Sequence, residues 1–270
     1  MEAKQKEETS GVVRHFSSVS KAAAILLWGA LIIVCLIYRD EITVERIVNF
    51  TPSEPLAAAA VMLLLGMLGM QGMAGYVFPT YYRMPAAQSA ASLAGSIAML
   101  AICAPFAAKF AKKFGKKELS IASCAFGAIA YIVCLIVRPQ NAYVYVAFYT
   151  LAYIGLGFFN TVILAMITDV IDDAEVKNGV REDGTIYSVY SFARKLGQAA
   201  TAGLSGALLS MVGYTQATQF DPGVTLGIFR LSRIIPAIGL GLVAVALAFI
   251  YPLNKKRVEE NSAILAKKQK

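Results

Sequence analysis

Long apolar stretches separated by short polar links run along this chain of 270 residues. Seven of them approach the roughly 20 apolar residues that a helix needs to cross a bilayer. Charges are rare inside them: Arg83 is the only charged residue from Leu56 to Ala108. Because backbone polar groups within a bilayer must be satisfied inside the segment, the pattern predicts an all-α membrane protein with six to seven transmembrane helices. The stretches are 21–38, 56–80, 88–109, 119–137, 142–168, 185–212 and 232–252.

Composition narrows the class further. Apolar residues make up 57% of the chain and charged residues 16%, whereas soluble domains usually carry about 25% charged residues. The apolar content excludes a disordered chain, and four cysteines inside apolar stretches, without paired spacing, exclude a disulfide-stapled secreted fold. A single histidine, His15, and the lack of Gly-x-Ser-x-Gly, P-loop or His-Glu-x-x-His motifs indicate no enzyme, no metal site and no cofactor.

Basic residues gather in two clusters, which predict the orientation in the membrane. One cluster follows the stretch 88–109 and the other lies in a basic tail at 255–270. Four predicted spans separate them, so both can lie in the cytoplasm, as the positive-inside rule requires. We therefore expect a multi-pass protein of the plasma membrane, in contact with lipid and not nucleic acid, with a cytoplasmic C-terminus. The clusters comprise Lys109, Lys112, Lys113, Lys116 and Lys117, and Lys255, Lys256, Arg257, Lys267, Lys268 and Lys270.

The first apolar stretch, 21–38, fits this orientation less well. It is at the short end of the spanning range, it lacks the cleavage site of a signal peptide, and parity places its N-terminal side outside if it crosses. Two interpretations stay open: it follows other helices that set its direction, or it is an interfacial segment. Residues 1–20 are then either extramembrane or an artefact of where translation begins.

A polar stripe runs along the segment 185–212. At about 100° per residue, Ser188, Ser191, Lys195 and Gln198 share one face, which small residues continue. Lys195 lies about 15 Å from Thr185, near the middle of a core about 30 Å thick, where an unpaired charge is costly. Such a face suits a hydrated cavity or close helix packing. Lys195 either functions in that cavity, or it snorkels or pairs structurally with a carboxylate.

The link 169–184 is rich in acidic residues. Asp169, Asp172 and Asp173 share a face at the end of the preceding helix, where negative charge is unfavourable, so they need basic partners. The link is either a solvated loop or an ion-pair lock that forms and breaks with conformation. Its spacing is not that of a calcium loop. The candidate partners are Lys177, Arg181 and the lysines after 88–109, among them Lys116 and Lys117.

Four more polar residues lie inside apolar stretches. Gln71 either contacts a polar solute or makes an interhelical hydrogen bond. Tyr149, Tyr153 and Asn160 either line a cavity for a hydroxyl-rich solute or pack between helices.

The acidic link and the segment after it resemble the glycoside–pentoside–hexuronide cation symporters of the major facilitator superfamily. The family pattern is Asp-x-x-Asp-Tyr-x-Glu-x-Lys-x-Gly-x-Arg, then Tyr-Ser, with a lysine eight residues after that tyrosine. Asp173 stands here in place of the first tyrosine, and Lys116 and Lys117 resemble the family's basic turn between helices eight and nine. The pattern is filled by Asp169, Asp172, Glu175, Lys177, Gly179, Arg181, Tyr187, Ser188 and Lys195.

This resemblance covers about residues 56–258 and implies the C-terminal half of a major-facilitator-type fold. Residues 21–38 would be helix six, 39–55 a central loop and 56–254 helices seven to twelve. The implied activity is transport of a sugar or glycoside coupled to Na⁺ or H⁺, with the solute between two halves. Lys195 would lie beside solute and cation, and a cytoplasmic gate would comprise Asp169, Asp172, Glu175 and Arg181.

The family's N-terminal half, with its main cation-coordinating acids, has no counterpart in this sequence. We therefore expect the chain to act with a separate N-terminal half or a second copy of itself. The alternatives are a truncated or split fragment without transport activity, or a membrane scaffold or regulatory protein.

Overall fold

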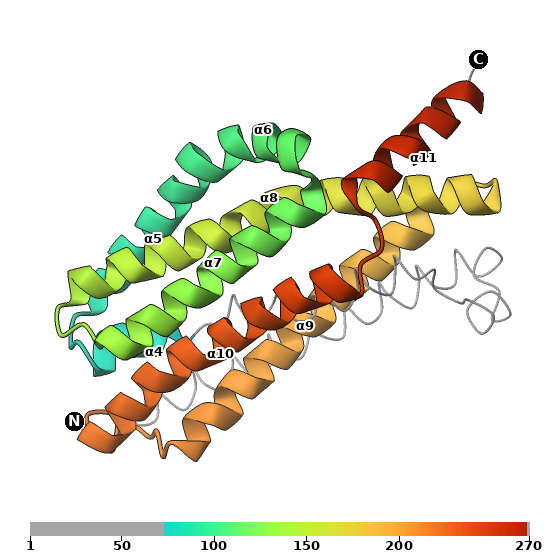
Figure 1. Cartoon of the computed structure of the whole chain (residues 1–270). Helices are drawn as coiled ribbons and strands as arrows, with labels where there is room; N and C mark the ends of the chain where they lie inside the picture. Colours follow the sequence, from blue (N-terminus) through green and yellow to red (C-terminus); the bar gives the residue numbers. More distant parts are fainter. Residues whose placement is uncertain (1–72, 269–270) are drawn as a thin grey trace, which may run out of the picture. The chain divides into compact units, whose positions relative to one another are not determined.

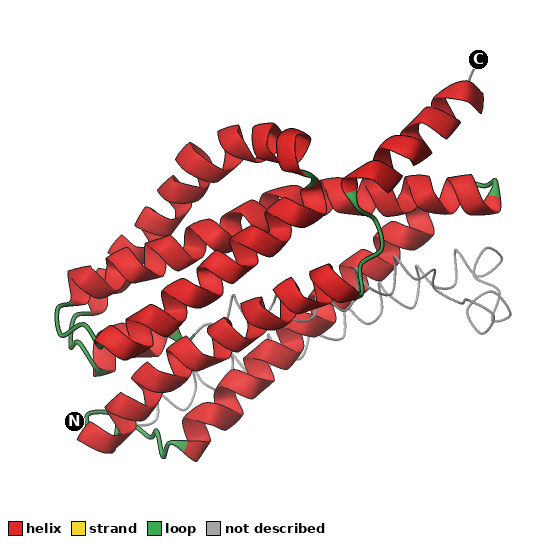
Figure 2. Ribbon diagram, viewed as in Figure 1, coloured by secondary structure: helices red, strands yellow, loops and turns green. Residues whose placement is uncertain are grey.

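The computed structural model describes residues 73–268, which form helices joined by short loops, without strands (Figures 1 and 2). The predicted all-α class is confirmed for this part of the chain. The predictions for 1–20, 21–38, 39–55, most of 56–80 and Gln71 lie outside it. The elements are α4 (Ala74–Thr80), α5 (Pro85–Ala98), the π-helix η1 (Met99–Cys103), α6 (Ala104–Phe114), α7 (Lys116–Val137), α8 (Ala142–Asn178), α9 (Asp183–Met211), α10 (Pro222–Phe249) and α11 (Lys255–Lys268).

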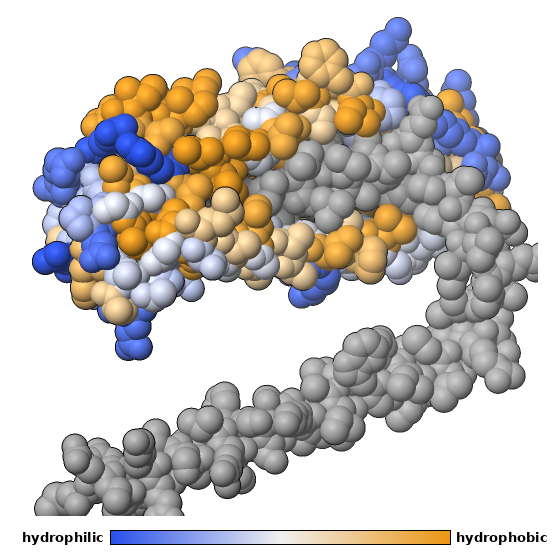
Figure 3. Space-filling view, turned by 90° about the horizontal axis from the view of Figure 1, so that it is seen from below, coloured by the Kyte–Doolittle hydropathy of each residue, from blue (hydrophilic) through white to orange (hydrophobic). Residues whose placement is uncertain are grey.

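Four helices in the described part are long and apolar enough to cross a membrane. They are the continuous helix Pro85–Phe114, then α7, α8 and α10, with 30, 22, 37 and 28 residues. At about 1.5 Å per residue even the shortest spans about 33 Å, enough for the hydrocarbon core. Large apolar side chains stay exposed on these helices, and hydrophobic residues cover most of the face in Figure 3, with hydrophilic ones toward its ends.

Two helices extend further than the apolar pattern predicts. The α8 helix continues past Thr168 to Asn178 and ends at Gly179, whose φ of 76° is the left-handed conformation that terminates helices. The α10 helix begins at Pro222, well before the predicted start at 232, because proline is favoured in the first turn. Hydropathy detects the membrane-embedded part of a helix, whereas the helix itself ends where capping and backbone conformation end it.

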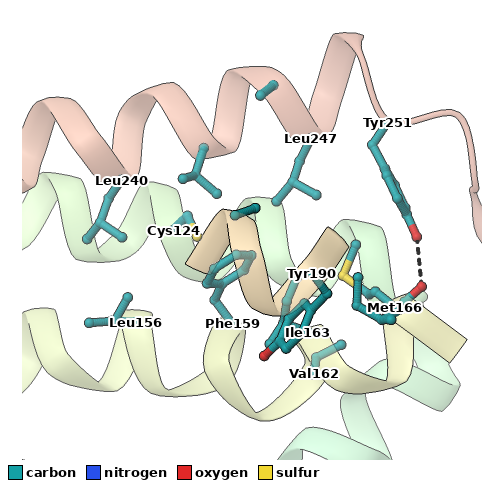
Figure 4. Packing of buried hydrophobic residues seen from close by; sticks show 14 of the residues in the cluster. Cys124, Leu156, Phe159, Val162, Ile163, Met166, Tyr190, Leu240, Leu247 and Tyr251 are labelled. Atoms are coloured by element: carbon teal, nitrogen blue, oxygen red, sulfur yellow. Dashed lines mark hydrogen bonds between the residues drawn. The ribbon is translucent and has the colours of Figure 1, made fainter. Parts of the chain in front are cut away.

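The α7 helix packs against α8 on one side and α10 on the other (Figure 1). Gly127 and Gly155 let α7 and α8 touch backbone to backbone: a Cβ on Gly155 would lie 2.5 Å from the Ser123 carbonyl oxygen. Such close approach through small residues is a main source of helix association in lipid. Around it lies the largest buried cluster, drawn in Figure 4, with Cys124 from α7, Phe159 and Met166 from α8, Tyr190 from α9, and Leu240 and Leu247 from α10.

The helix Pro85–Phe114 is bent where η1 interrupts it. Five residues, Met99–Cys103, have π-helical hydrogen bonding, and Pro105 lies two residues beyond them. Both features are established causes of helix bending. At the bend the helix touches α8 closely, since a Cβ on Gly157 would lie 2.7 Å from the Cys103 sulfur.

Gly155→Ala should lower the free energy of unfolding by about 1–3 kcal/mol, because the added methyl group pushes α7 away from α8. Gly203→Ala is the matched control: its Cβ would meet nothing within 4 Å, and alanine is the better helix former by about 0.5–1 kcal/mol. Unfolding in mixed detergent micelles measures both. Equal stability of the two variants would show that the α7–α8 contact tolerates a side chain.

Candidate functional site

The α9 helix presents the predicted polar stripe away from its packed face. Ser191, Lys195 and Gln198 are exposed. The opposite face is buried: Ile186, Tyr190 and Ala193 belong to the largest apolar cluster, and Gly197 and Thr201 are buried further along the helix. The helix therefore packs through small and apolar residues and leaves its polar side chains uncovered by the described part of the chain.

Lys195 forms no ion pair within residues 73–268. It lies twelve residues into α9, about 18 Å along the axis from Asp183. The α9 helix, which contains nearly all of the predicted span 185–212, is not among the four helices of the described part that are apolar enough to cross a membrane. An ammonium group inside a bilayer would need water or a counter-charge, because transfer into hydrocarbon costs several kcal/mol. The neighbouring Arg194 differs: its Nη1 donates a hydrogen bond to the Tyr190 hydroxyl at 3.3 Å.

The candidates on α8 lie within the bundle and are partly packed. The rings of Tyr149 and Tyr153 stack with centroids 5.7 Å apart. Tyr153 also meets the close approach of α5, since a Cβ on Gly95 would lie 3.1 Å from the tyrosine Cδ1. Asn160 is half-buried further along the helix.

An ion pair joins the start of α7 to α8. The Lys116 Nζ lies 2.6 Å from the Asp169 Oδ1, and the side chains are 32% and 6% exposed. The ammonium also donates to the Ala165 carbonyl at 3.1 Å. Lys117, in contrast, contacts no acid in the described part; it donates to the carbonyls of Tyr251 (2.7 Å) and Ala248 (3.3 Å). Thus Lys116 balances a buried charge, and Lys117 covers the end of α10.

Arg181 binds the acidic end of α8. Its Nη1 donates to Glu175 (2.8 Å) and Asp172 (3.0 Å), and its Nε lies 3.0 Å from an Asp183 oxygen. Hydrogen bonds with Glu175 first, and then with Asp172, raise the pKa of Arg181 above its usual range. The guanidinium therefore ties the turn between α8 and α9 to the acids that precede it.

Asp173 connects α8 to the C-terminal helix α11, a role that sequence reasoning missed. It is 2% exposed and lies 2.9 Å from the Lys177 Nζ and 3.1 Å from the Arg257 Nε. Asn261 donates a further hydrogen bond at 3.0 Å. The basic tail is thus a helix docked on a buried carboxylate. One feature of the sequence could have indicated this contact: Asp173 stands where the family pattern has tyrosine.

Sequence reasoning also missed Arg233 of α10, although a charge inside the apolar stretch 232–252 was visible. It is fully buried, near the end of the bundle formed by the α7–α8 turn. Its guanidinium carbon lies 4.2 Å from the ring centroid of Tyr145 and 5.1 Å from that of Tyr131. It donates hydrogen bonds to the Tyr145 hydroxyl and the Ser232 hydroxyl. Aromatic faces and hydroxyl groups thus stand in for a carboxylate, since no acid pairs with Arg233 in the described part.

Residues 42–255 match the family described as MFS/sugar transport protein. An uncharacterized symporter of Bacillus subtilis is 34% identical over 119 residues, 44% of this chain and 26% of that protein. A glucuronide carrier protein homolog of Escherichia coli is 30% identical over 169 residues, 63% of this chain and 36% of that protein. An isoprimeverose transporter of Lactiplantibacillus pentosus is 32% identical over 121 residues, 41% and 25% respectively. The chain therefore matches about a quarter to a third of each relative's length.

The Lys116–Asp169 pair should show a coupling energy of about 1–3 kcal/mol in a double-mutant cycle of Lys116→Met and Asp169→Asn, because Asp169 is buried. The control is Lys256–Glu260 of α11, 3.9 Å apart and 85% and 57% exposed, for which coupling stays below about 1 kcal/mol. Free energies of unfolding measure both cycles. Equal couplings would mean that Lys116 adds no stability through Asp169.

Arg233→Met should destabilise the protein by about 1–2 kcal/mol, since the two cation–π contacts and the hydrogen bonds are lost while the length of the side chain is kept. Arg230→Met is the matched control, three residues earlier on α10 and exposed. Thermal unfolding in detergent compares the two. An Arg233→Met protein as stable as the wild type would rule out a stabilising clamp.

Proposed function

The chain belongs to the MFS/sugar transport protein family, in agreement with its resemblance to the glycoside–pentoside–hexuronide symporters, and from this premise we propose that it transports a sugar or glycoside. The transport is secondary and active, coupled to Na⁺ or H⁺. In this proposal the chain provides helices seven to twelve of the transporter, in the plasma membrane, with its C-terminus in the cytoplasm.

The observation that carries the proposal is the uncovered polar stripe on α9, with Lys195 at its centre. A membrane helix that exposes Ser191, Lys195 and Gln198 is stable only if that face meets water or a polar partner. In transporters of this fold the solute binds at the interface of two halves. We therefore assign the stripe to that interface, with Lys195 beside the solute and the co-transported ion.

Tyr149, Tyr153 and Asn160 of α8 belong to the same proposed region. Stacked tyrosine rings provide flat apolar surfaces and hydroxyl groups, which suit the faces and hydroxyls of a sugar ring. Because Tyr149 and Tyr153 are partly buried, only the exposed edges of their rings can contact the solute. The relatives include a glucuronide carrier protein homolog and an isoprimeverose transporter, which supports a sugar or glycoside as the solute.

The ion pairs at the other end of α8 form the proposed cytoplasmic gate. Lys116 with Asp169, and Arg181 with Asp172 and Glu175, hold α7, α8 and the α8–α9 turn together. Each pair joins elements within this half. When the gate opens, an ion pair within this half would be replaced by one with the opposing half. This exchange changes the relative free energy of the open and closed states, as alternating access requires.

The proposal requires an opposing half, for which a separate N-terminal half and a second copy of this chain are the two candidates that can be tested with this chain. Either would cover the polar stripe on α9 and complete the solute pathway between two repeats. The proposal therefore predicts that activity depends on which second half is present.

Uptake of a panel of labelled sugars and glycosides into membrane vesicles tests the function. The chain is measured alone and together with the N-terminal half of a relative, under a Na⁺ gradient and under a pH gradient. Lys195→Ala should reduce coupled uptake by about tenfold or more, because a charge at the solute site is lost. Lys256→Ala, in the exposed part of α11, should leave uptake unchanged.

The outcomes separate the alternatives. Uptake by the chain alone, lost in Lys195→Ala, shows a working assembly of copies. Uptake only with the added half shows a split transporter. The absence of uptake in both cases contradicts the proposal and favours a fragment or a scaffold, and equal uptake by both lysine variants contradicts the role of Lys195.

A further inference from the structure

Two cavities meet at the end of α6 next to α7. The first, of about 150 Å³, lies between the α6–α7 turn, the end of α8 and the start of α11. The second, of about 470 Å³, runs between α6 and α8. They share Ala111, Lys112 and Lys116 in their walls. The basic pocket and the second cavity are therefore adjacent, with these three residues between them.

The walls of the two cavities differ in chemistry. Four lysines reach the first cavity from three segments of the chain: Lys112, Lys116, Lys117 and Lys255. The second cavity has walls of Ala104, Ala107, Ala108, Val162 and Ala165, with Thr161 among them. The site therefore combines a cationic end with an apolar groove.

The positive charge of the first cavity is only partly neutralised. Lys116 balances Asp169, and Lys255 lies 3.9 Å from Glu259, the other acid in the wall. Lys117 is held by backbone carbonyls, and Lys112 pairs with no acid in the described part of the chain. The walls hold four lysines and two acids, and the carboxylate of Glu118 lies beside the wall residue Gly115, so the local excess is about one positive charge.

The bend at η1 explains the apolar groove. The helix touches α8 at Cys103, whose sulfur donates to the Ile154 carbonyl at 3.4 Å. Beyond Pro105 the apolar α6 side chains in the groove wall are alanines, too small to fill the space. Phe106, Phe110 and Phe114, four positions apart, are exposed on α6, and the ring of Phe110 also meets that of Phe158 on α8, with centroids 6.0 Å apart. This surface is apolar and faces lipid if the helix spans the bilayer, so an acyl chain can enter the groove from the membrane.

We propose that an anionic phospholipid of the cytoplasmic leaflet binds at this site. Its phosphate lies in the first cavity, near Lys112, Lys117 and Lys255, and one acyl chain lies in the groove between α6 and α8. Basic pockets between helices on the cytoplasmic side suit anionic headgroups. A soluble anion would use the lysines alone, whereas a lipid uses both cavities, which is why their adjacency favours a lipid. The site lies apart from the stripe on α9; the inference rests on the proposed cytoplasmic side of this end of the helices, but not on the proposed solute or its coupling ion.

Native mass spectrometry of the full chain, released from nanodiscs of phosphatidylglycerol and phosphatidylcholine, tests the site. The wild type should retain phosphatidylglycerol in preference to phosphatidylcholine. The double variant Lys112→Ala/Lys255→Ala should bind phosphatidylglycerol more weakly by about fivefold for each lysine removed. The control Lys256→Ala/Lys268→Ala removes two lysines outside the cavity walls and should retain the lipid.

A second variant tests the groove without changing the charge. Ala108→Phe fills the groove from an exposed position and keeps all four lysines. It should lose phosphatidylglycerol while its thermal unfolding in detergent stays close to that of the wild type. Addition of inorganic phosphate should not displace the lipid.

Three results would overturn the proposal. Retention of phosphatidylglycerol by the double variant at the level of the control would show that the lysines do not bind it. Equal retention of phosphatidylcholine by the wild type would remove the charge selectivity. Displacement by inorganic phosphate, with no effect of Ala108→Phe, would assign the pocket to a soluble anion.

Discussion

A bilayer offers almost no water to a charge, and the way in which this chain accommodates its charges determines how its helices associate. Asp169 and Asp173 are buried on α8, and each is balanced by basic groups from elements distant in the sequence. Arg233 is buried without an acid and rests between tyrosine rings. These contacts join α7, α8, α10 and α11. Lys195 differs from them, because nothing described in this half compensates it.

Close packing of small residues complements these polar contacts. Glycines bring α7 and α8 together near Gly155, and the contact at Cys103 brings the bent helix onto α8 at one point. Where the bent helix leaves α8, alanines leave space and lysines collect beside it. Lipid provides little hydrophobic driving force for helix association. The helices therefore depend on the close glycine contact between α7 and α8, and the open groove beside α6 costs little stability.

Together these features separate two kinds of surface. The faces of α7, α8 and α10 that meet each other are held by glycines, ion pairs and the buried arginine. The exposed stripe of α9 carries polar side chains that no helix of the described part covers. The chain belongs to the sugar transport family, and in transporters built from two repeats the solute binds between them. One polar face and one packed face on the same set of helices fit that arrangement.

The sequence by itself determined the helical class, the approximate position of four spans, the polar stripe and the family. Hydrophobic runs and local motifs are properties of adjacent residues, so they are readable without coordinates. It did not determine where α8 ends or where α10 begins, because helix capping and the first-turn proline, not hydropathy, set those positions.

Only the tertiary structure decided which charges meet. Asp173 and Arg257 are 84 residues apart, and Arg233 and Tyr145 are 88 apart. The two cavities likewise need α6, α7, α8 and α11 to come together. Such partners are chosen by helix packing and by the energetic cost of an unbalanced charge in the core, and neither is encoded in any short stretch of the chain.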